Sequence, residues 1–361
     1  MSFGNCYKGK KVLLTGHTGF KGSWMAIWLK QLGADVYGFA LAPTSDLDNF
    51  VTCGLENEIH HQEGDVRDAK ALASYFAKVQ PDIAFHLAAQ PLVLLSYQDP
   101  VGTFETNLMG VINFFEAVRH TPSVKVAINV TSDKCYDNKE WVWGYRENDP
   151  MGGKDPYSAS KGCAELITSS YIHSYFSNSG CHVASARAGN VIGGGDWAKD
   201  RIVPDYFRAA KAGEKLTIRN PYATRPWQHV LEPLSGYLNL GASMYNEGIE
   251  YSGGWNFGPE DTANYSVKQL IDKMLLIDPN GGYTIPADTV KPHEAHLLKL
   301  DISKAVNQLD WRPALSFDET VEFTVGGYND DLKGQDILNK RVEQIVSYTA
   351  KASKKGIEWA Q

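Results

Sequence analysis

The chain has 361 residues, of which 43% are hydrophobic and 21% charged, values typical of a globular protein with one large core and a smaller second lobe. Its formal net charge of −7 argues against a general nucleic-acid binder, which needs an excess of Lys and Arg. No run approaches the ~18 uninterrupted apolar residues of a membrane span, and the N-terminus lacks the apolar centre of a signal peptide. We therefore expect a cytoplasmic protein that binds neither nucleic acid nor membrane.

The cysteines carry no sign of a disulfide framework or of a metal site. They are five in number, scattered along the chain and never spaced as CxxC: Cys6, Cys53, Cys135, Cys163 and Cys181. Disulfide-rich domains and zinc sites show paired, closely spaced cysteines. We expect free thiols and no bound metal.

Short apolar runs alternate with helical periodicity through the first half of the chain. The runs predict strands at residues 12–15, 35–41, 60–64, 83–89, 124–131 and 182–188. Apolar residues spaced by three and four predict helices at residues 23–31, 69–79, 101–119 and 158–173. This alternation predicts an α/β fold with a doubly wound parallel sheet, the Rossmann architecture, over residues 1–188.

The regularity lapses after residue 188. A glycine-rich loop at residues 193–196 and scattered prolines follow, with one more strand end near Trp255. We expect residues 189–361 to form a smaller substrate lobe, interleaved with Rossmann segments that return at about residues 226–260. The Lys-rich helix predicted near the C-terminus, at residues 335–358, is expected to be a solvated surface element.

A glycine turn joins the first strand to the first helix. Gly16, Gly19 and Gly22 have GxxGxxG spacing, with His17 and Phe20 between them. Glycines let the backbone approach a pyrophosphate, and the helix N-terminus offers it free N–H groups. The turn predicts a dinucleotide site, with a plain strand–helix turn as the alternative.

The second strand does not clearly distinguish an NAD site from an NADP site. Its only carboxylate, Asp35, lies at its beginning, whereas an NAD site usually has an acidic residue at the strand's end. No Arg follows to hold the 2′-phosphate of NADP. We predict NAD with weak binding of the adenosine ribose.

Two later strand ends complete the expected cofactor site. After the third strand, Asp65 and Val66 are expected near the adenine, although Asp65 also suits a helix N-cap. After the fourth, small residues allow a cofactor to pass: Leu87, Ala88 and Ala89. His86, inside that apolar strand, is interpreted as a packed histidine and not as a catalyst.

A Tyr and a Lys stand four residues apart at the start of a predicted helix. This spacing places Tyr157 and Lys161 on one helical face, where a cation lowers the pKa of a phenol. Ser132 follows the fifth strand, at the sheet edge where ligands of such folds bind. The three residues predict a centre that removes a hydroxyl proton while hydride leaves the same carbon.

The glycine turn, the small strand end at residues 87–89, Ser132 and the Tyr157/Lys161 pair resemble the extended short-chain dehydrogenase/reductase family. Within it, two longer motifs resemble the nucleotide-sugar 4,6-dehydratases that act on CDP-D-glucose. They are Thr131-Ser132-Asp133-Lys134 and the stretch from Arg187 to Trp197. The resemblance covers essentially the whole chain and implies an NAD-dependent enzyme, a carbon–oxygen hydro-lyase of deoxysugar biosynthesis for surface polysaccharide such as O-antigen.

The resemblance also implies a redox-neutral cycle from CDP-D-glucose to CDP-4-keto-6-deoxy-D-glucose and water. Tyr157, Lys161 and Ser132 start it by oxidising C4, and Asp133 protonates the departing C6 hydroxyl. Relatives place a Glu, the base at C5, where this chain has Lys134. Two interpretations stand: Lys134 is a base whose pKa is lowered by burial, or it stabilises the enolate while Asp133 shuttles the proton. A plain salt bridge is the third.

The remaining expectations concern the substrate and the assembly. Asn190 holds the family position for a phosphate contact, and Arg201 and Arg225 suit a diphosphate, with surface salt bridges as the alternative. The resemblance implies a homodimer through a four-helix interface of residues 101–119 and 158–173, or a tetramer. A nucleotide-sugar 4-epimerase and a non-catalytic dinucleotide sensor are the competing functions.

Overall fold

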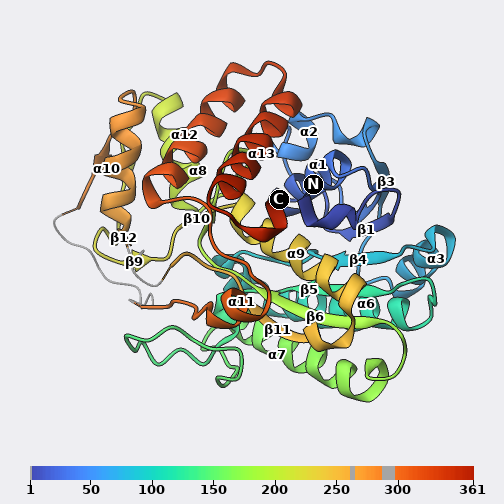
Figure 1. Ribbon diagram of the computed structural model, residues 1–361. Coiled ribbons are helices and arrows are strands. Elements are labelled where there is room, and N and C mark those ends of the chain that lie inside the picture. The colour runs from blue at the N-terminus through green and yellow to red at the C-terminus, as the bar shows by residue number, and fades with distance from the viewer. Residues whose placement is uncertain (1, 261–264, 287–296) are drawn as a thin grey trace.

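The computed structural model describes residues 2–260, 265–286 and 297–361 (Figure 1). Seven strands form one sheet in the order β11-β6-β5-β4-β1-β2-β3, with every neighbouring pair parallel. They are β1 Lys11–Thr15, β2 Asp35–Ala40, β3 His60–Glu63, β4 Ile83–His86, β5 Val126–Val130, β6 His182–Arg187 and β11 Gly253–Asn256. The order reverses at β1, as in a Rossmann sheet, and the predicted fold class is confirmed.

Central strands of the sheet are apolar on both sides because helices cover both faces. In β1, Leu13 belongs to one core cluster while Val12 and Leu14 belong to the other, and none of the three is exposed. Every residue of β5 is buried as well. Such runs of buried, mostly apolar residues are typical of parallel strands, and they made these strands visible in the sequence.

Two groups of helices form the outer layers. One face carries α3 (Ala69–Val79), α6 (Gly110–Arg119) and α7 (Pro156–Tyr171). The other carries α1 (Phe20–Gln31) and α9 (Leu231–Glu247), which crosses in front of the strands in Figure 1. The shorter helices are α2 (Asn49–Thr52), α4 (Val93–Gln98), α5 (Pro100–Phe104) and α11 (Ser303–Gln308). A π-helical turn, Glu105–Met109, joins α5 to α6 within the helix predicted at residues 101–119.

A smaller lobe lies beside the carboxyl ends of the strands (Figure 1). Its helices are α8 (Ile202–Lys211), α10 (Val267–Ile277) and α12 (Phe317–Lys333). Short paired strands accompany them: β7 (Val191–Ile192) with β10 (Gln228–His229), β8 (Leu216–Thr217) with β13 (Tyr283–Thr284), and β9 (Thr224–Arg225) with β12 (Tyr265–Ser266). In its separate core, Phe207 stacks on Tyr328 at 4.2 Å between ring centroids.

The last long helix, α13 (Ile337–Lys354), is not the solvated element that its lysines suggested. It packs on α1, with Tyr348 fully buried edge-on against Trp28. Its lysines occupy the outer face, and that composition obscured an apolar stripe on the inner face. Past its end, Trp359 stacks on Phe3 at 4.9 Å, so the two ends of the chain meet on this side of the sheet.

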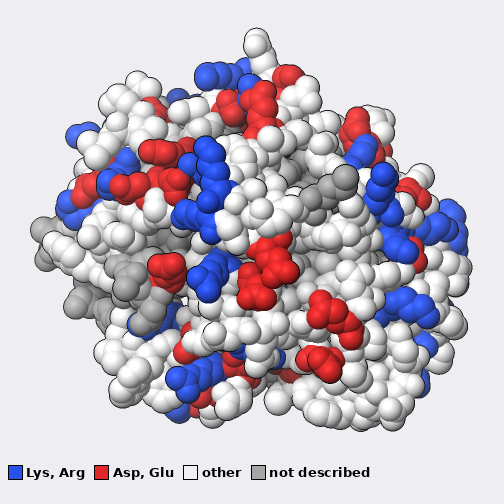
Figure 2. Space-filling view, viewed as in Figure 1, with Lys and Arg blue, Asp and Glu red and all other residues white. Residues whose placement is uncertain are grey.

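The face in Figure 2 shows basic and acidic side chains interspersed, without a single basic field. No helix in the described ranges combines the length and hydropathy needed to cross a bilayer. All five cysteines lie in these ranges and are unpaired, as expected. Four of them are buried.

Candidate active site

The glycine turn is built as a phosphate-binding turn requires. Gly16 has φ +75°, and a Cβ there would lie 2.6 Å from the backbone nitrogen of Ala88 at the end of β4. A Cβ on Gly22 would lie 2.2 Å from the Gly16 carbonyl oxygen. Gly19 is the N-cap of α1 and makes no side-chain cap, so the first N–H groups of the helix stay available to an anion.

His17 occupies the space beside the end of β2. It is fully buried, its Nε2 lies 2.7 Å from Nδ1 of His61, and burial, with a smaller effect of His61, lowers its pKa to about 3. A Cβ on Gly38 would lie within 2.5 Å of the His17 ring. A neutral imidazole therefore stands beside the position where an NAD site usually presents a carboxylate.

The other residues expected at the cofactor lie on strand ends around this turn. Asp65 binds the backbone N–H of Arg67 at 2.9 Å and its guanidinium at 2.6 Å, while Asp68 is the N-cap of α3. The N-cap alternative for Asp65 is therefore wrong. Val66 is buried, and the three residues at 87–89 are partly exposed along the turn. His86 is a packed histidine, buried with Nδ1 2.8 Å from the Thr15 hydroxyl.

Ser132 and Asp133 form a buried pair directly after β5. The Ser132 hydroxyl donates to Asp133 Oδ1 at 2.9 Å, and Nδ2 of Asn190 lies 3.4 Å from Asp133 Oδ2. Gly189 makes room for the carboxylate, since a Cβ there would lie 2.0 Å from Oδ2. Asn190 adopts φ +52°, a left-handed conformation that Asn tolerates better than most residues. Two strand ends, of β5 and β6, thus converge on one carboxyl group.

Tyr157 and Lys161 enter the same cleft from α7. Asp155 caps this helix by accepting from Ser158 N at 2.9 Å, and Pro156 occupies its first turn. Tyr157 and Lys161 are only 8% and 6% exposed, one helical turn apart. The structure therefore brings Ser132, Asp133, Tyr157 and Lys161 to one edge of the sheet.

Burial controls the protonation of both α7 residues. It raises the pKa of Tyr157 to about 12, against a lowering by the hydrogen-bonded Ser132 hydroxyl and by the Arg201 charge. Burial lowers the pKa of Lys161 to about 8. Arg201 is the cation whose charge lowers the pKa of this phenol. Without ligands the phenol is therefore protonated at neutral pH.

The three residues expected to contact the substrate's phosphates, Asn190, Arg201 and Arg225, come from three different segments of the chain. Arg201 forms an ion pair with the buried Asp196 at 2.8 Å and acts on Tyr157, so it borders the cleft. Arg225 lies on β9 in the smaller lobe, where its guanidinium donates to the Thr224 carbonyl at 2.8 Å. Asn190 donates to the carboxylate of Asp133 at 3.4 Å.

Lys134 is the site residue whose environment differs most from expectation. Its backbone N–H donates to Ser132 Oγ at 3.2 Å, but its side chain is exposed. The interpretation of a base created by burial requires a dry environment, which this side chain lacks. The alternatives in which its charge acts without burial, on an enolate or in a salt bridge, do not need such an environment.

Comparison with known proteins agrees with this geometry. The family model of GDP-mannose 4,6-dehydratase matches residues 13–324. The chain is 48% identical to CDP-glucose 4,6-dehydratase of Salmonella typhimurium over 349 residues, or 95% of this chain and 97% of the relative. The chain belongs to the nucleotide-sugar 4,6-dehydratase family. Its resemblance to extended short-chain dehydrogenases/reductases is thereby confirmed.

Solved structures show how widely this fold is shared. The dTDP-glucose 4,6-dehydratase of Bacillus anthracis, in complex with NAD, has a TM-score of 0.72 and 18% identity over 91% of this chain and all of that chain. The UDP-glucose 4-epimerase of Thermus thermophilus, also with NAD, has a TM-score of 0.73 and 24% identity over 88% of this chain and 99% of that chain. Dehydratases and epimerases thus share the scaffold, and it does not separate the two activities.

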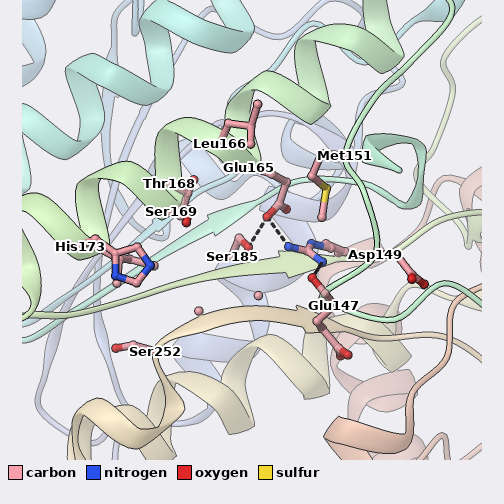
Figure 3. A pocket seen from close by; sticks show the side chains of 14 residues that line it. Glu147, Asp149, Met151, Glu165, Leu166, Thr168, Ser169, His173, Ser185 and Ser252 are labelled. Atoms are coloured by element: carbon pink, nitrogen blue, oxygen red, sulfur yellow. Dashed lines mark hydrogen bonds and ion pairs between the residues drawn. The ribbon is translucent and has the colours of Figure 1, made fainter. Parts of the chain in front are cut away.

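A buried ion pair joins α7 to the end of β6 beneath the cleft. Glu165 on α7 binds Arg187 at the end of β6 at 2.7 Å, with both side chains 5% exposed or less, and it accepts from Ser185 at 2.6 Å (Figure 3). The same carboxylate accepts from the Thr131 hydroxyl, next to Ser132. Glu165, Ser185 and Arg187 line a cavity of about 430 Å³. Ser132, Asp133 and Tyr157 do not border it. The network positions the catalytic strand ends against α7.

The residues present fit a dinucleotide in this family. Gly16 leaves space that any side chain would fill, and no acidic side chain stands in the first turn of α1 to repel a pyrophosphate. The glycine turn and the Tyr157 and Lys161 pair lie at the same edge of the sheet. The end of β2 provides neither the carboxylate of a strong ribose site nor an Arg for a 2′-phosphate.

Sequence reasoning missed three residues of this cleft. Lys21 stands inside the glycine turn and Tyr237 on α9, with the Lys21 ammonium 6.0 Å from the Tyr237 ring centroid. Glu165 is the third, four residues after Lys161. A charged residue between Gly19 and Gly22 was the available signal for Lys21, whereas nothing local marked Tyr237.

Proposed function

We propose that this dehydratase uses NAD to convert CDP-D-glucose into CDP-4-keto-6-deoxy-D-glucose and water. One observation favours dehydration over a reaction that only exchanges hydride with the sugar. A buried carboxyl, Asp133, lies beside Ser132 in the same cleft as Tyr157, as a C6 hydroxyl departure requires. The 48% identity to a CDP-glucose 4,6-dehydratase over nearly the whole chain supports the cytidine nucleotide.

When bound, NAD⁺ accepts hydride from the sugar's C4 and adds a positive charge to the cleft. Tyr157 takes the proton of the 4-hydroxyl, and Ser132 holds the same oxygen. Burial raises the phenol's pKa to about 12, so Arg201 and the added charge favour its ionisation. Lys161, on the same face of α7, holds the cofactor and keeps a second positive charge nearby.

Asp133 supplies the proton that leaves with the C6 hydroxyl as water. Its carboxyl is 3% exposed and is oriented by Ser132 and Asn190, so a proton placed on it is directed into the cleft. Asp133 first takes the C5 proton as a carboxylate and then gives it to the departing hydroxyl, while the exposed Lys134 stabilises the enolate. The return of hydride to C6, together with a solvent proton delivered to C5 through Asp133, closes the cycle with no net oxidation.

Arg201 and Asn190 border the same cleft and are proposed to contact the substrate's diphosphate. Arg matches such an anion with parallel donors. Arg225 lies on β9 in the smaller lobe, and we assign it to the nucleotide end of the substrate. The five unpaired cysteines agree with the reducing conditions of the cytoplasm, where we place this activity.

The activity test uses purified protein with CDP-glucose and NAD⁺ in deuterated water. We expect a product lighter by one water, with one solvent deuteron at C5 and with the substrate's own hydrogen retained at C6. Parallel reactions with the UDP, dTDP and GDP sugars test the nucleotide.

Replacing Tyr157 with Phe should abolish turnover while the fold is kept. Interconversion of sugar epimers without loss of water would establish an epimerase instead. A wild-type protein that binds dinucleotide but converts no sugar would be a sensor, and the Tyr157→Phe change would then have no consequence for binding.

We also propose a homodimer formed by helices α5, α6 and α7, with a tetramer as its further assembly. Large apolar side chains are exposed on these elements and on the π-helical turns that extend them: Val101, Met109, Leu166 and Tyr175. Exposed apolar patches of this kind mark interaction surfaces.

A further inference from the structure

Lys21 is a cation built into the glycine turn. It is the second residue of α1, between Phe20 and Gly22. Gly22 packs so closely on the Gly16 carbonyl that the first turn of α1 lies directly against the glycine turn. The catalytic scheme makes no use of it. Its place in the turn nevertheless puts it on the wall of any dinucleotide bound there.

The ammonium of Lys21 faces the catalytic cleft. Its Nζ lies 6.0 Å from the centroid of the Tyr237 ring on α9 and interacts electrostatically with Lys161 and Asp133. No carboxylate in the described parts of the chain comes within ion-pair distance of it. Burial, followed by the charge of Lys161, lowers the pKa of Lys21 to about 8, so at neutral pH most molecules carry this charge.

Tyr237 gives an independent sign that this wall is made for a ligand. Its side chain is fully buried, and among the described residues its hydroxyl has no hydrogen-bond partner. The hydroxyl interacts electrostatically with Asp133. A buried hydroxyl without a partner is costly unless something bound satisfies it.

We propose that Lys21 is a second cation of the cofactor pocket, whose charge favours the reduced over the oxidised nicotinamide and so makes bound NAD⁺ a stronger oxidant. The inference rests on the proposed NAD-dependent function and deepens it. It assigns a role to a residue outside the Tyr157, Lys161 and Ser132 centre.

The charge balance of the first step explains the effect. The C4–H bond breaks, and its two electrons and hydrogen move to NAD⁺, giving NADH, while the O4 proton passes to Tyr157. The nicotinamide ring loses its positive charge in this transfer. A fixed ammonium nearby repels the oxidised ring and not the reduced one, and in a partly desolvated cleft this repulsion is a substantial interaction. Oxidation of the sugar is thereby favoured.

The test compares the affinities of the purified protein for NAD⁺ and NADH in wild type and in Lys21 variants. We expect Lys21→Met to tighten the binding of NAD⁺ relative to the binding of NADH by about tenfold. This change is equivalent to a fall of about 30 mV in the reduction potential of the bound two-electron couple. Lys21→Arg, which keeps the charge, should stay near wild type. Lys30→Met, at the other end of α1, is the matched control and should leave the ratio unchanged.

Each outcome decides a different question. An unchanged ratio in Lys21→Met, or an equal loss of both affinities as from a phosphate anchor, would overturn the inference. Lys21→Gln provides the same neutral test if Lys21→Met does not fold, as judged by circular dichroism. A wild-type protein that binds neither form would refute the proposed function itself, and that result is distinct from a wild type that binds both without influence of Lys21.

Discussion

At the scale of single residues, Asp133 is the group on which the proposed elimination depends. It lies between Ser132 and Asn190, and Gly189 leaves just enough space for its carboxylate. The sequence placed this residue correctly at the end of a strand. Ser132 is its neighbour in the sequence, but Gly189 and Asn190 lie more than 50 residues further along the chain, so only the folded protein shows their part.

Asp133→Asn should block both proton removal at C5 and loss of water. The amide still accepts from Ser132 but cannot donate the proton needed by the leaving hydroxyl, so we expect turnover to fall by about 10²–10⁴-fold. Mass spectrometry of CDP-glucose recovered from deuterated water should show no deuterium at C5, because the exchange of that proton also needs Asp133.

Asp137→Asn is the control for this change, since Asp137 is a nearby carboxylate that pairs with the exposed Lys139. It should turn over like wild type. An Asp133→Asn enzyme that forms product at the wild-type rate would remove Asp133 from the mechanism.

At the scale of elements, α7 is fixed to the carboxyl ends of β5 and β6 through one carboxylate. Glu165 binds Arg187 and Ser185 on β6 and the Thr131 hydroxyl after β5. The YxxxK spacing predicted the face of α7 that carries Tyr157 and Lys161. It did not predict that the next turn of the same helix anchors the opposing strands.

Glu165→Gln should therefore destabilise the fold strongly. Removing one partner of a buried ion pair leaves Arg187 as an uncompensated buried charge, at a cost of about 3–5 kcal/mol in the free energy of unfolding. Urea unfolding followed by circular dichroism measures the loss. Glu116→Gln, which breaks the exposed pair with Arg119, should change the midpoint little, and similar midpoints for both variants would contradict the anchoring role.

Glu232 on α9 gives the protein a dependence of stability on pH. Burial raises its pKa to about 7, although it accepts hydrogen bonds from Ala314 N, Leu315 N and the Tyr348 hydroxyl. A carboxyl whose pKa is higher in the folded than in the unfolded chain binds more protons when folded. Its contribution to stability is therefore complete below about pH 4.5 and is lost as pH rises to about 7.

We expect Glu232→Gln to remove this loss. Between pH 5 and pH 8 the free energy of unfolding of wild type should fall relative to that of the variant by about 3 kcal/mol, the order of magnitude set by the shift in pKa. Denaturant titrations at the two pH values provide the comparison. Parallel behaviour of the two proteins would show that this carboxyl does not titrate between them.

At the scale of the whole molecule, exposed apolar side chains on α7 and on the helical segment of α5 and α6 leave a face available to a second copy. Leu166 is 61% exposed on α7, and Met109 is 46% exposed beside α6. Both lie on the helical layer opposite α9, away from the smaller lobe. The proposed dimer would cover them without closing the cleft.

Leu166→Glu should convert the proposed dimer into monomers, because the charge would be buried without a partner at the centre of the interface. Sedimentation or size-exclusion chromatography measures the change in mass. Leu276→Glu on α10, where the leucine is 79% exposed, is the control and should leave the assembly unchanged. Dissociation by the α10 change alone would move the interface to the smaller lobe.

The sequence by itself determined the Rossmann sheet, the glycine turn and which polar residues stand at the strand ends and on the face of α7. These features are local: apolar runs, glycine spacing and a helical i, i+4 pair are set by the geometry of strands, turns and helices. The family followed from the same local motifs.

Only the tertiary structure decided the environments of these residues. Solvent exposure of Lys134, the burial that sets the pKa values of Tyr157 and Lys161, and the meeting of Lys21 with Tyr237 all depend on segments distant in the chain. Burial and electrostatic neighbours are properties of the packed molecule, since side chains from several elements must converge before a charge is desolvated. For the same reason, the Lys-rich sequence of α13 did not show that the inner face of this helix is buried.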